Sequence, residues 1–383
     1  MTKESFFQKY SDIILFSALK IKEDDVLSIN TEEEDYAFAR LLAEKAKRIT
    51  GNGSYIQLLK NGRIVESFDI LSSSPLTKKP TCFIYLPYYK KKDEIDTEKI
   101  YEAKELQNFN LLSDPLDIPN PSFPFVTCPL PNKEWDEIIS ENDWNNDSFS
   151  LLSSILSLEE PDYIEYNNLR HDNLLYYVKE LNKLGLKEGR ITNDEGTDLF
   201  FSFLPESEFA SSFSRTTDDR YFSPYIFSSD IFRLIDPMSL SGWLNTSKSV
   251  VIWGKPVKNL SLYFENGRVT KYKGNMFSEA LFNLYSKQDD NSIRASMLTL
   301  SETSHPLNGE EATYFPELDR MRTVSITIGG PKGEAVKEEN IEKTIDSITT
   351  LSLPIGTDSL SITCIDKDGE ERVIYEDGTI IVD

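Results

Sequence analysis

The apolar residues near the start of the chain follow a helical repeat, and those soon after it form a short run. The repeat predicts an amphipathic helix over residues 3–19. Its apolar positions are Phe6, Phe7, Tyr10, Ile13, Ile14 and Ala18. The run at residues 26–29 predicts a buried strand. A second helix is expected to begin near Thr31, which opens a capping-box pattern, and to end at Gly51.

Helical and strand patterns keep alternating through the first half of the chain. Strands are predicted at residues 54–59, 82–86 and 125–128. A charged helix is predicted at residues 97–106, and another over residues 167–184 that ends before Gly185. The polar residues 141–165 are typical of a loop. Because strands and helices alternate with short connections, an α/β domain with a parallel sheet and flanking helices is predicted for residues 1–185.

The second half, residues 186–383, consists mostly of short apolar runs separated by turn signals such as Asp377-Gly378. Strands are predicted at residues 199–204, 249–257, 260–264, 268–273, 323–328, 359–365, 372–375 and 379–382. Helices are predicted at residues 276–288 and 338–352. This half is therefore expected to form a β-rich α+β domain that closes with an antiparallel meander.

The chain is strongly acidic, with 64 acidic and 41 basic residues and a formal net charge of −23. Such a surface repels phosphate backbones and anionic lipids, so nucleic acids and membranes are not expected as partners. No apolar run reaches the ~18 residues that a membrane span needs, and no signal peptide is visible at the N-terminus. Three widely spaced cysteines fit a reducing compartment rather than a disulfide framework. A cytoplasmic location is expected.

The chain has only two histidines, so it offers few nitrogen ligands for a metal ion. His171 lies beside an apolar helix stripe and is expected to be structural, and His305 precedes a proline and is expected at the surface. The glycine-rich residues 329–333 lack the spacing of a phosphate loop, so a tight turn is expected there. Five aspartates near strand ends offer oxygen ligands for a hard divalent ion: Asp198, Asp230, Asp236, Asp319 and Asp358.

The order of several short motifs resembles the aminopeptidase T / aminopeptidase S family of two-domain metallo-exopeptidases. The motifs lie at residues 10–29, 195–199, 223–232, 260–269, 323–329 and 358–378. Residues 195–199, Glu-Gly-Thr-Asp-Leu, resemble the family's Gly-Thr-Asp-Leu strand. Residues 323–329, Thr-Val-Ser-Ile-Thr-Ile-Gly, resemble its Thr-Val-His-Ile-Ala-Leu-Gly strand. The resemblance covers essentially the whole chain and implies a homodimer that acts on peptides.

The departures from the family pattern fall on its metal ligands, which are two glutamates, two histidines and an aspartate. The first glutamate aligns with Asp230, and the family aspartate with Asp358, so both retain a carboxylate. The remaining positions fall on Met297 (or Ser296, if the register shifts by one), Ser325 and Gly356. Only two of the five positions keep a side chain that can ligate a metal.

Three hypotheses follow from this pattern. In the first, the chain has lost its dinuclear metal site and acts as a non-catalytic homologue that binds peptide ends or a partner, with no cofactor. In the second, it is an active aminopeptidase with an altered site that holds one or two divalent metals (Zn, Co, Mn or Mg). In the third, the resemblance is superficial. Because two aspartates cannot fix two ions about 3.5–4 Å apart, the sequence favours the first.

Overall fold

The computed structural model describes most of the chain, and it separates into two compact units. The described residues are 1–60, 63–70, 78–87, 122–140, 147–211, 213–226, 229–302, 304–307, 311–330, 336 and 338–382. Unit 1 takes its described residues from 1–94, 120–171 and 212–228, and unit 2 takes them from 172–211 and 229–383. The predicted division of the chain into residues 1–185 and 186–383 stays a prediction.

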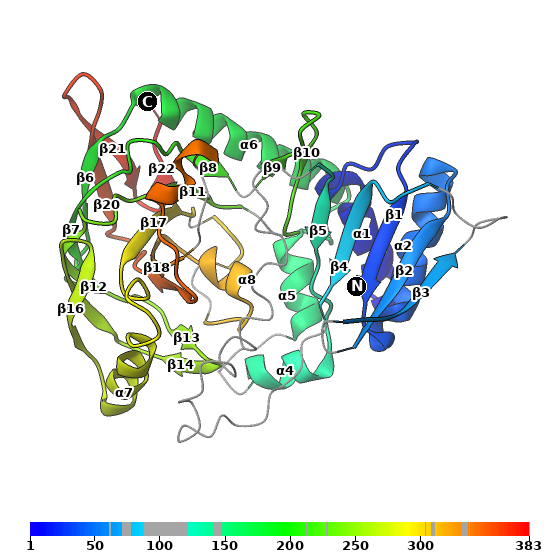
Figure 1. Ribbon diagram of the computed structural model, residues 1–383, viewed down its shortest axis with the longest axis horizontal. Coiled ribbons are helices and arrows are strands. Elements are labelled where there is room, and N and C mark those ends of the chain that lie inside the picture. The colour runs from blue at the N-terminus through cyan, green and yellow to red at the C-terminus, as the bar shows by residue number, and fades with distance from the viewer. Residues whose placement is uncertain are drawn as a thin grey trace. The chain divides into compact units, whose positions relative to one another are not determined.

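Unit 1 is built on a five-stranded sheet (Figure 1). Its strands, in spatial order, are β3 (Arg63–Ile70), β2 (Ser54–Lys60), β1 (Leu27–Thr31), β4 (Cys82–Leu86) and β5 (Phe125–Thr127). The pairs β1–β2, β1–β4 and β4–β5 are parallel, and only the edge strand β3 runs antiparallel. The predicted α/β architecture is therefore confirmed, since apolar strands buried on both faces form the centre of the sheet.

Helices complete unit 1. They are α1 (Lys3–Asp12), which continues as a π-helical segment (Ile13–Ala18), α2 (Tyr36–Thr50), α4 (Lys133–Ser140) and α5 (Ser148–Ile155). Helix α2 packs against β1 and β2 and ends at Gly51, which has a φ of 71°. Its predicted capping box is wrong, because the Thr31 hydroxyl donates to the Glu32 carbonyl and a 3₁₀ turn (Glu33–Asp35) precedes the helix.

Unit 2 contains two large antiparallel sheets. The eight-stranded sheet has the order β16 (Arg268–Lys273), β15 (Ser261–Glu265), β12 (Ser241–Asn245), β7 (Asp198–Ser202), β6 (Glu188–Thr192), β20 (Ser361–Ile365), β21 (Glu371–Glu376) and β22 (Thr379–Ile380). The five-stranded sheet has the order β19 (Thr350–Pro354), β18 (Ser325–Gly329), β17 (Ala295–Leu300), β11 (Ile231–Leu234) and β8 (Ala210–Ser211). The predicted β-rich domain and its closing meander β20–β21–β22 are confirmed.

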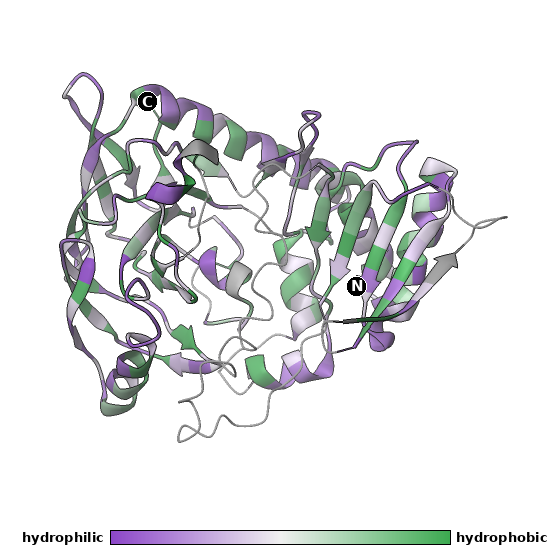
Figure 2. Ribbon diagram, in the orientation of Figure 1, coloured by the Kyte–Doolittle hydropathy of each residue, from purple (hydrophilic) through white to green (hydrophobic). Residues whose placement is uncertain are grey.

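Smaller elements complete the two units. They are the hairpin strands β9 (Ser214–Arg215) and β10 (Tyr221–Phe222) of unit 1, and β13 (Val250–Ile252), β14 (Lys255–Val257), α7 (Met276–Tyr285), α8 (Pro316–Arg320) and a 3₁₀ helix (Glu338–Lys343) of unit 2. The longest helix, α6 (Tyr163–Leu184), alternates hydrophobic and hydrophilic residues along its length (Figure 2). Across the described ranges, no helix is both long and apolar enough to cross a membrane.

Two predicted segments differ from the structure, and a third lies outside the described residues. The helix over residues 338–352 is wrong: only a 3₁₀ turn forms, and strand β19 follows, because Leu351 and Leu353 alternate with polar residues and become buried. The loop over residues 141–165 is wrong where α5 forms, since Asp147 caps that helix by accepting from Ser150 N at 2.7 Å. The helix predicted at residues 97–106 lies outside the described residues.

Candidate functional site

Asp230 lies immediately before strand β11, and its side chain is completely buried in unit 2. Arg320, the last residue of helix α8, faces it with Nε 2.9 Å from Oδ2. The Arg320 side chain keeps 20% of its exposure, and its Cζ lies 5.8 Å from the centre of the Phe232 ring. Burial raises the pKa of the Asp230 carboxyl, and the nearby guanidinium opposes that rise. A buried carboxylate here is balanced by a cation that belongs to the chain.

Asp358 has a different environment. It lies in an exposed turn between β19 and β20, next to Thr357, whose carbonyl accepts a hydrogen bond from Leu360 N. A carboxylate in such a turn is in contact with solvent. Of the two aspartates that the sequence proposed as metal ligands, the fold therefore buries one and leaves the other at the surface of unit 2.

Met297 and Ser325 lie on neighbouring strands of the five-stranded sheet. Met297 of β17 is opposite Leu234 of β11, and it packs in a hydrophobic cluster with Leu204, Phe232 and Leu234. One row further along, Thr299 is opposite both Phe232 and Ser325. Cross-strand partners share a face of the sheet. Met297, Phe232, Thr299 and Ser325 therefore line one face.

The alternative register, with Ser296 at the ligand position, gives a different placement. The β17–β18 register shifts between Ala295 and Met297, so Ser296 has no cross-strand partner in β18. Its hydroxyl donates to the Thr327 carbonyl at 3.2 Å. The register through Met297 is the one that shares a face with Phe232, whose ring is next to Arg320.

Gly356 is buried and has no room for a side chain. A Cβ atom at this position would lie 1.7 Å from Thr323 Oγ1 and 3.1 Å from the backbone nitrogen of Val324. Real Cβ atoms do not approach other heavy atoms so closely, and the Val324 nitrogen cannot move without the strand. A histidine at residue 356 would therefore require the Thr323 side chain or the backbone next to it to shift.

These residues do not fit a two-metal centre. In the part of the chain that the structure describes, no group of three or more His, Cys, Asp or Glu side chains is arranged to hold a metal ion. At the positions that the family resemblance assigns to ligands, the side chains are a buried carboxylate, an exposed carboxylate, a thioether, a hydroxyl and a glycine. Zinc prefers a closed set of imidazole, thiolate and carboxylate ligands, and the described residues at these positions do not form such a set.

The remaining candidate residues have contacts within their own unit. His171 stacks on Phe213 with ring centres 3.5 Å apart. His305 was expected at the surface but is buried, because its Nδ1 accepts a hydrogen bond from Leu307 N within a tight turn. Asp198 pairs with Arg190 on an exposed sheet face. None of these contacts forms a catalytic arrangement, and residues 331–333 of the glycine-rich stretch lie outside the described part.

Asp236 and Asp319 are likewise used locally. Asp236 accepts from Met238 N at 2.9 Å in the turn after β11. Asp319 accepts from Thr313 N at 2.6 Å and lies 3.3 Å from Arg322 Nε. Arg322, which is almost fully buried, also donates to the Ser249 carbonyl at 2.8 Å. These contacts fix the segment that carries Arg320.

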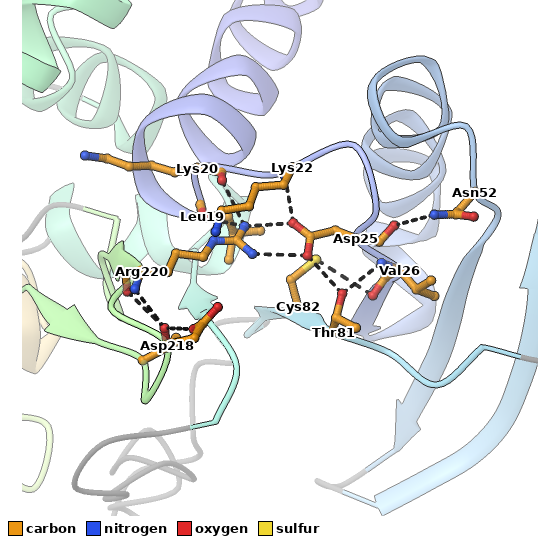
Figure 3. Close-up of polar contacts among 11 residues, drawn as sticks. Leu19, Lys20, Lys22, Asp25, Val26, Asn52, Thr81, Cys82, Asp218 and Arg220 are labelled. Carbon is orange, nitrogen blue, oxygen red and sulfur yellow. Dashed lines mark hydrogen bonds and ion pairs between the residues drawn. The ribbon is translucent and has the colours of Figure 1, made fainter.

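A second buried polar cluster lies in unit 1 (Figure 3). Arg220 reaches Asp25 with Nη2 2.8 Å from Oδ2 and also donates to the carbonyls of Leu19 and Lys20, both at 2.9 Å. Asp25 accepts in addition from Lys22 N at 2.7 Å and from Thr81 Oγ1 at 2.9 Å. The cluster holds the β9–β10 hairpin to the end of the π-helical segment, which is a structural role.

Sequence reasoning did not single out Arg320 or Arg322. The signal was present as Asp319-Arg320-Met321-Arg322, in which one acid and two bases follow core residues such as Phe315 and Leu318. Charged side chains are almost never buried unless they are paired, so such a run next to core residues indicates ion pairs. The partner Asp230, however, lies about ninety positions away, and only the fold brings it close.

Known proteins resemble this chain at the level of family and at the level of fold. A family model described as thermophilic metalloprotease (M29) matches residues 3–380. Aminopeptidase AmpS of Bacillus subtilis (strain 168) is 22% identical over 255 residues, which are 64% of this chain but only 58% of that protein. The structure of wild-type AmpT from Thermus thermophilus has a TM-score of 0.77 at 15% identity and covers 99% of both chains. A 2,5-dihydroxypyridine dioxygenase from Pseudomonas putida KT2440 shares the fold less closely, with a TM-score of 0.56 at 12% identity, over 100% of this chain and 98% of that one.

Proposed function

The chain belongs to the thermophilic metalloprotease (M29) family, and from that premise we propose that it is a member without a two-metal centre, which binds peptide ends or a protein partner instead of hydrolysing peptides. One observation carries the proposal. The side chains at the aligned ligand positions bring a single carboxylate, Asp230, to the face that Met297 and Ser325 share, and Gly356 leaves no room for a further ligand.

The chemistry of a two-metal hydrolase explains why this observation matters. Such an enzyme holds two ions about 3.5–4 Å apart and activates a bridging water between them. Each ion needs several fixed ligands. One buried carboxylate, Asp230, and one exposed carboxylate, Asp358, cannot supply them for two ions. The hydrolytic water would have no activated position.

A binding role agrees with the charge of the chain. With a net charge of −23, its surface attracts cationic groups, and the free amino terminus of a peptide is one such group. The family resemblance adds a homodimer to the proposal. The three widely spaced cysteines add the cytoplasm, a reducing compartment, as its location.

The alternative is an active, metal-dependent aminopeptidase with an altered site that releases N-terminal amino acids. The family match over residues 3–380 favours it, since the whole family architecture is retained. In this alternative, Asp230 and Asp358 hold one or two divalent ions, and replacing Asp358 by Ala abolishes hydrolysis.

Metal content separates the two functions. The untagged protein is incubated with Zn²⁺, Co²⁺ or Mn²⁺, desalted and measured by elemental mass spectrometry, with Bacillus subtilis aminopeptidase AmpS treated in parallel. We expect close to zero ions per chain and no release of amino acids from unblocked peptides. Close to two ions per chain, together with hydrolysis that Asp358→Ala removes, would establish the alternative and refute the proposal.

Binding is tested with peptides in matched pairs. Each fluorescent peptide is used once with a free amino terminus and once acetylated, and its anisotropy is followed at low and at high salt. We expect the free-amine form to bind more tightly and to weaken as salt increases, because the attraction is electrostatic. Equal binding of both forms would exclude recognition of the peptide amino terminus.

A further inference from the structure

The Asp230 carboxylate is in an environment that requires a positive charge beside it. Its side chain is completely buried, and removing an ionised carboxylate from water without a counter-charge is very costly. In a metalloenzyme, a bound ion supplies that charge. Here, Arg320 Nε lies 2.9 Å from Oδ2, and the guanidinium carbon lies 5.8 Å from the Phe232 ring on the same face.

Two further oxygen atoms on this face are buried and unused. Thr299 (0% exposed) and Ser325 (2% exposed) are cross-strand partners in the row that contains Phe232. Neither Thr299 Oγ1 nor Ser325 Oγ makes a hydrogen bond within the described ranges. Buried hydroxyls are normally hydrogen-bonded, so an unpartnered pair needs an explanation. Carboxylate and hydroxyl oxygens are the ligand type that hard cations such as Mg²⁺, Ca²⁺ and Mn²⁺ accept.

Arg320 is brought to this face by a segment that is fastened at several points. The carbonyl of Met321 accepts from Ser301 Oγ at 2.7 Å, and Met321 Sδ lies 3.2 Å from Ser229 N. Arg322, next along the chain, donates to the Ser249 carbonyl at 2.8 Å. The backbone on the C-terminal side of Arg320 is therefore fixed, and the side chain reaches Asp230 from a fixed Cα position.

We infer that the Arg320 guanidinium takes the place of a metal ion as the counter-cation of Asp230, on the sheet face that also carries the Thr299 and Ser325 hydroxyls. This inference rests on the proposed function, because it explains how the protein does without a metal at the centre. It also goes further, since it names the residue that replaces the ion and predicts that its removal makes the protein respond to divalent cations.

The test is thermal unfolding of Arg320→Met with and without millimolar Mg²⁺, Ca²⁺ or Mn²⁺. The variant removes the positively charged guanidinium but keeps an unbranched side chain of similar length. We expect its unfolding midpoint to fall on the order of 5 °C, and to recover by most of that shift when a hard divalent cation is added. The wild-type midpoint should not respond to these cations or to EDTA.

Two control variants make the result specific. Arg320→Met with Asp230→Asn removes both charges. The unfolding midpoint of this double variant should therefore lie above that of the single variant and should not change when divalent cations are added. Arg220→Met breaks the other buried pair, with Asp25, where both carboxylate oxygens already accept hydrogen bonds from Lys22 N and Thr81 Oγ1. Its loss of stability should not be recovered by any cation.

The outcomes separate the two proposals. If Arg320→Met is destabilised and no cation restores it, Arg320 is an ordinary ion-pair partner and the inference is overturned, while the proposed function stands. If the wild type itself binds two ions tightly, the proposed function fails instead. Should Arg320→Met not fold alone, folding only when Mn²⁺ is present supports the inference. Failure with and without Mn²⁺, while the double variant folds, overturns it.

Discussion

Each unit of the protein contains a buried arginine–aspartate pair, and the two pairs are surrounded differently. In unit 1, Asp25 and Arg220 keep only 9% and 6% of their side-chain exposure, and the backbone of Leu19, Lys20 and Lys22 contributes further hydrogen bonds (Figure 3). In unit 2, Asp230 and Arg320 pair on the sheet face that also carries Thr299 and Ser325, whose hydroxyls make no hydrogen bond within the described residues.

The difference indicates what each pair is for. A buried ion pair by itself is weak evidence of stability, because desolvation of the two charges offsets much of their attraction. What distinguishes a structural pair is that neighbouring groups use its remaining donors and acceptors, as at Asp25. The face that carries Asp230 instead includes two hydroxyls, of Thr299 and Ser325, that have no hydrogen-bond partner among the described residues. This is expected where a polar site has lost its ligand.

The largest expected effect is at the pair in unit 1. Replacing Arg220 by Met leaves the Asp25 carboxylate buried without its cation and also frees the carbonyls of Leu19 and Lys20. We expect the free energy of unfolding to fall by about 3–5 kcal/mol, measured by denaturant titration. The change should exceed that of Arg320→Met, because the Arg320 side chain is more exposed.

The matched control for this prediction is Arg220→Met combined with Asp25→Asn. Removing both charges should return part of the lost stability, since no buried charge is then left alone. If Arg220→Met costs less than Arg320→Met, the backbone contacts of Arg220 contribute little, and the proposed contrast between the two pairs is incorrect.

A smaller effect is expected at Gly356, on the unit 2 side of the comparison. A single methyl group there would lie 1.7 Å from Thr323 Oγ1, so Gly356→Ala forces the backbone or Thr323 to move. We expect a loss of about 1–3 kcal/mol in the free energy of unfolding. Adding Thr323→Ala removes the clashing oxygen and should recover part of the loss.

An unchanged stability of Gly356→Ala would have a specific meaning. It would show that the strand end after β19 adapts easily, and that a histidine ligand at this position is sterically possible. The steric part of the argument against a two-metal centre would then fail, although the missing ligands at Met297 and Ser325 would remain.

The architecture could be predicted from the sequence because it depends on local repeats. The apolar runs at residues 26–29 and 82–86 are short and bounded by turn residues, so both are predicted as strands of a parallel sheet. In the structure they pair in parallel as β1 and β4. Where local signals conflict, the prediction fails. Residues 338–352 contain helix-favouring acids at one end and a β-type alternation at the other, and the alternation determines the fold.

The site could be predicted only in part, for a different physical reason. Asp230 was recognised from a motif, because the residues around it are contiguous. Arg320 was not, since the ion pair depends on a contact between positions far apart in the chain, and a surface arginine and a buried one look alike in sequence. The same holds for His305. It is buried, and its Nδ1 accepts a hydrogen bond from the backbone nitrogen of Leu307, two residues further along the chain.

The smallest expected effect is at Asp35. Unlike Asp25 and Asp230, this carboxylate has acidic residues beside it and not an arginine. Asp35 lies at the start of α2 beside Glu34 and Glu32, and desolvation together with these charges raises its pKa from 3.8 to about 6. The folded state therefore holds the Asp35 proton more tightly than the unfolded state does. That contribution to stability is complete below about pH 4 and is lost as the pH rises through about 6.

Replacing Asp35 by Asn should remove this pH dependence. We expect the difference in free energy of unfolding between the wild type and Asp35→Asn to change by about 1 kcal/mol between pH 4 and pH 7, in favour of the variant at pH 7. The value is reduced for the part of the side chain that water reaches. Denaturant unfolding at both pH values measures it, with Glu33→Gln as the control for losing one exposed charge from the same turn. A pH-independent difference would mean that Asp35 is well solvated. Burial alone would then not account for the need of Asp25 and Asp230 for an arginine.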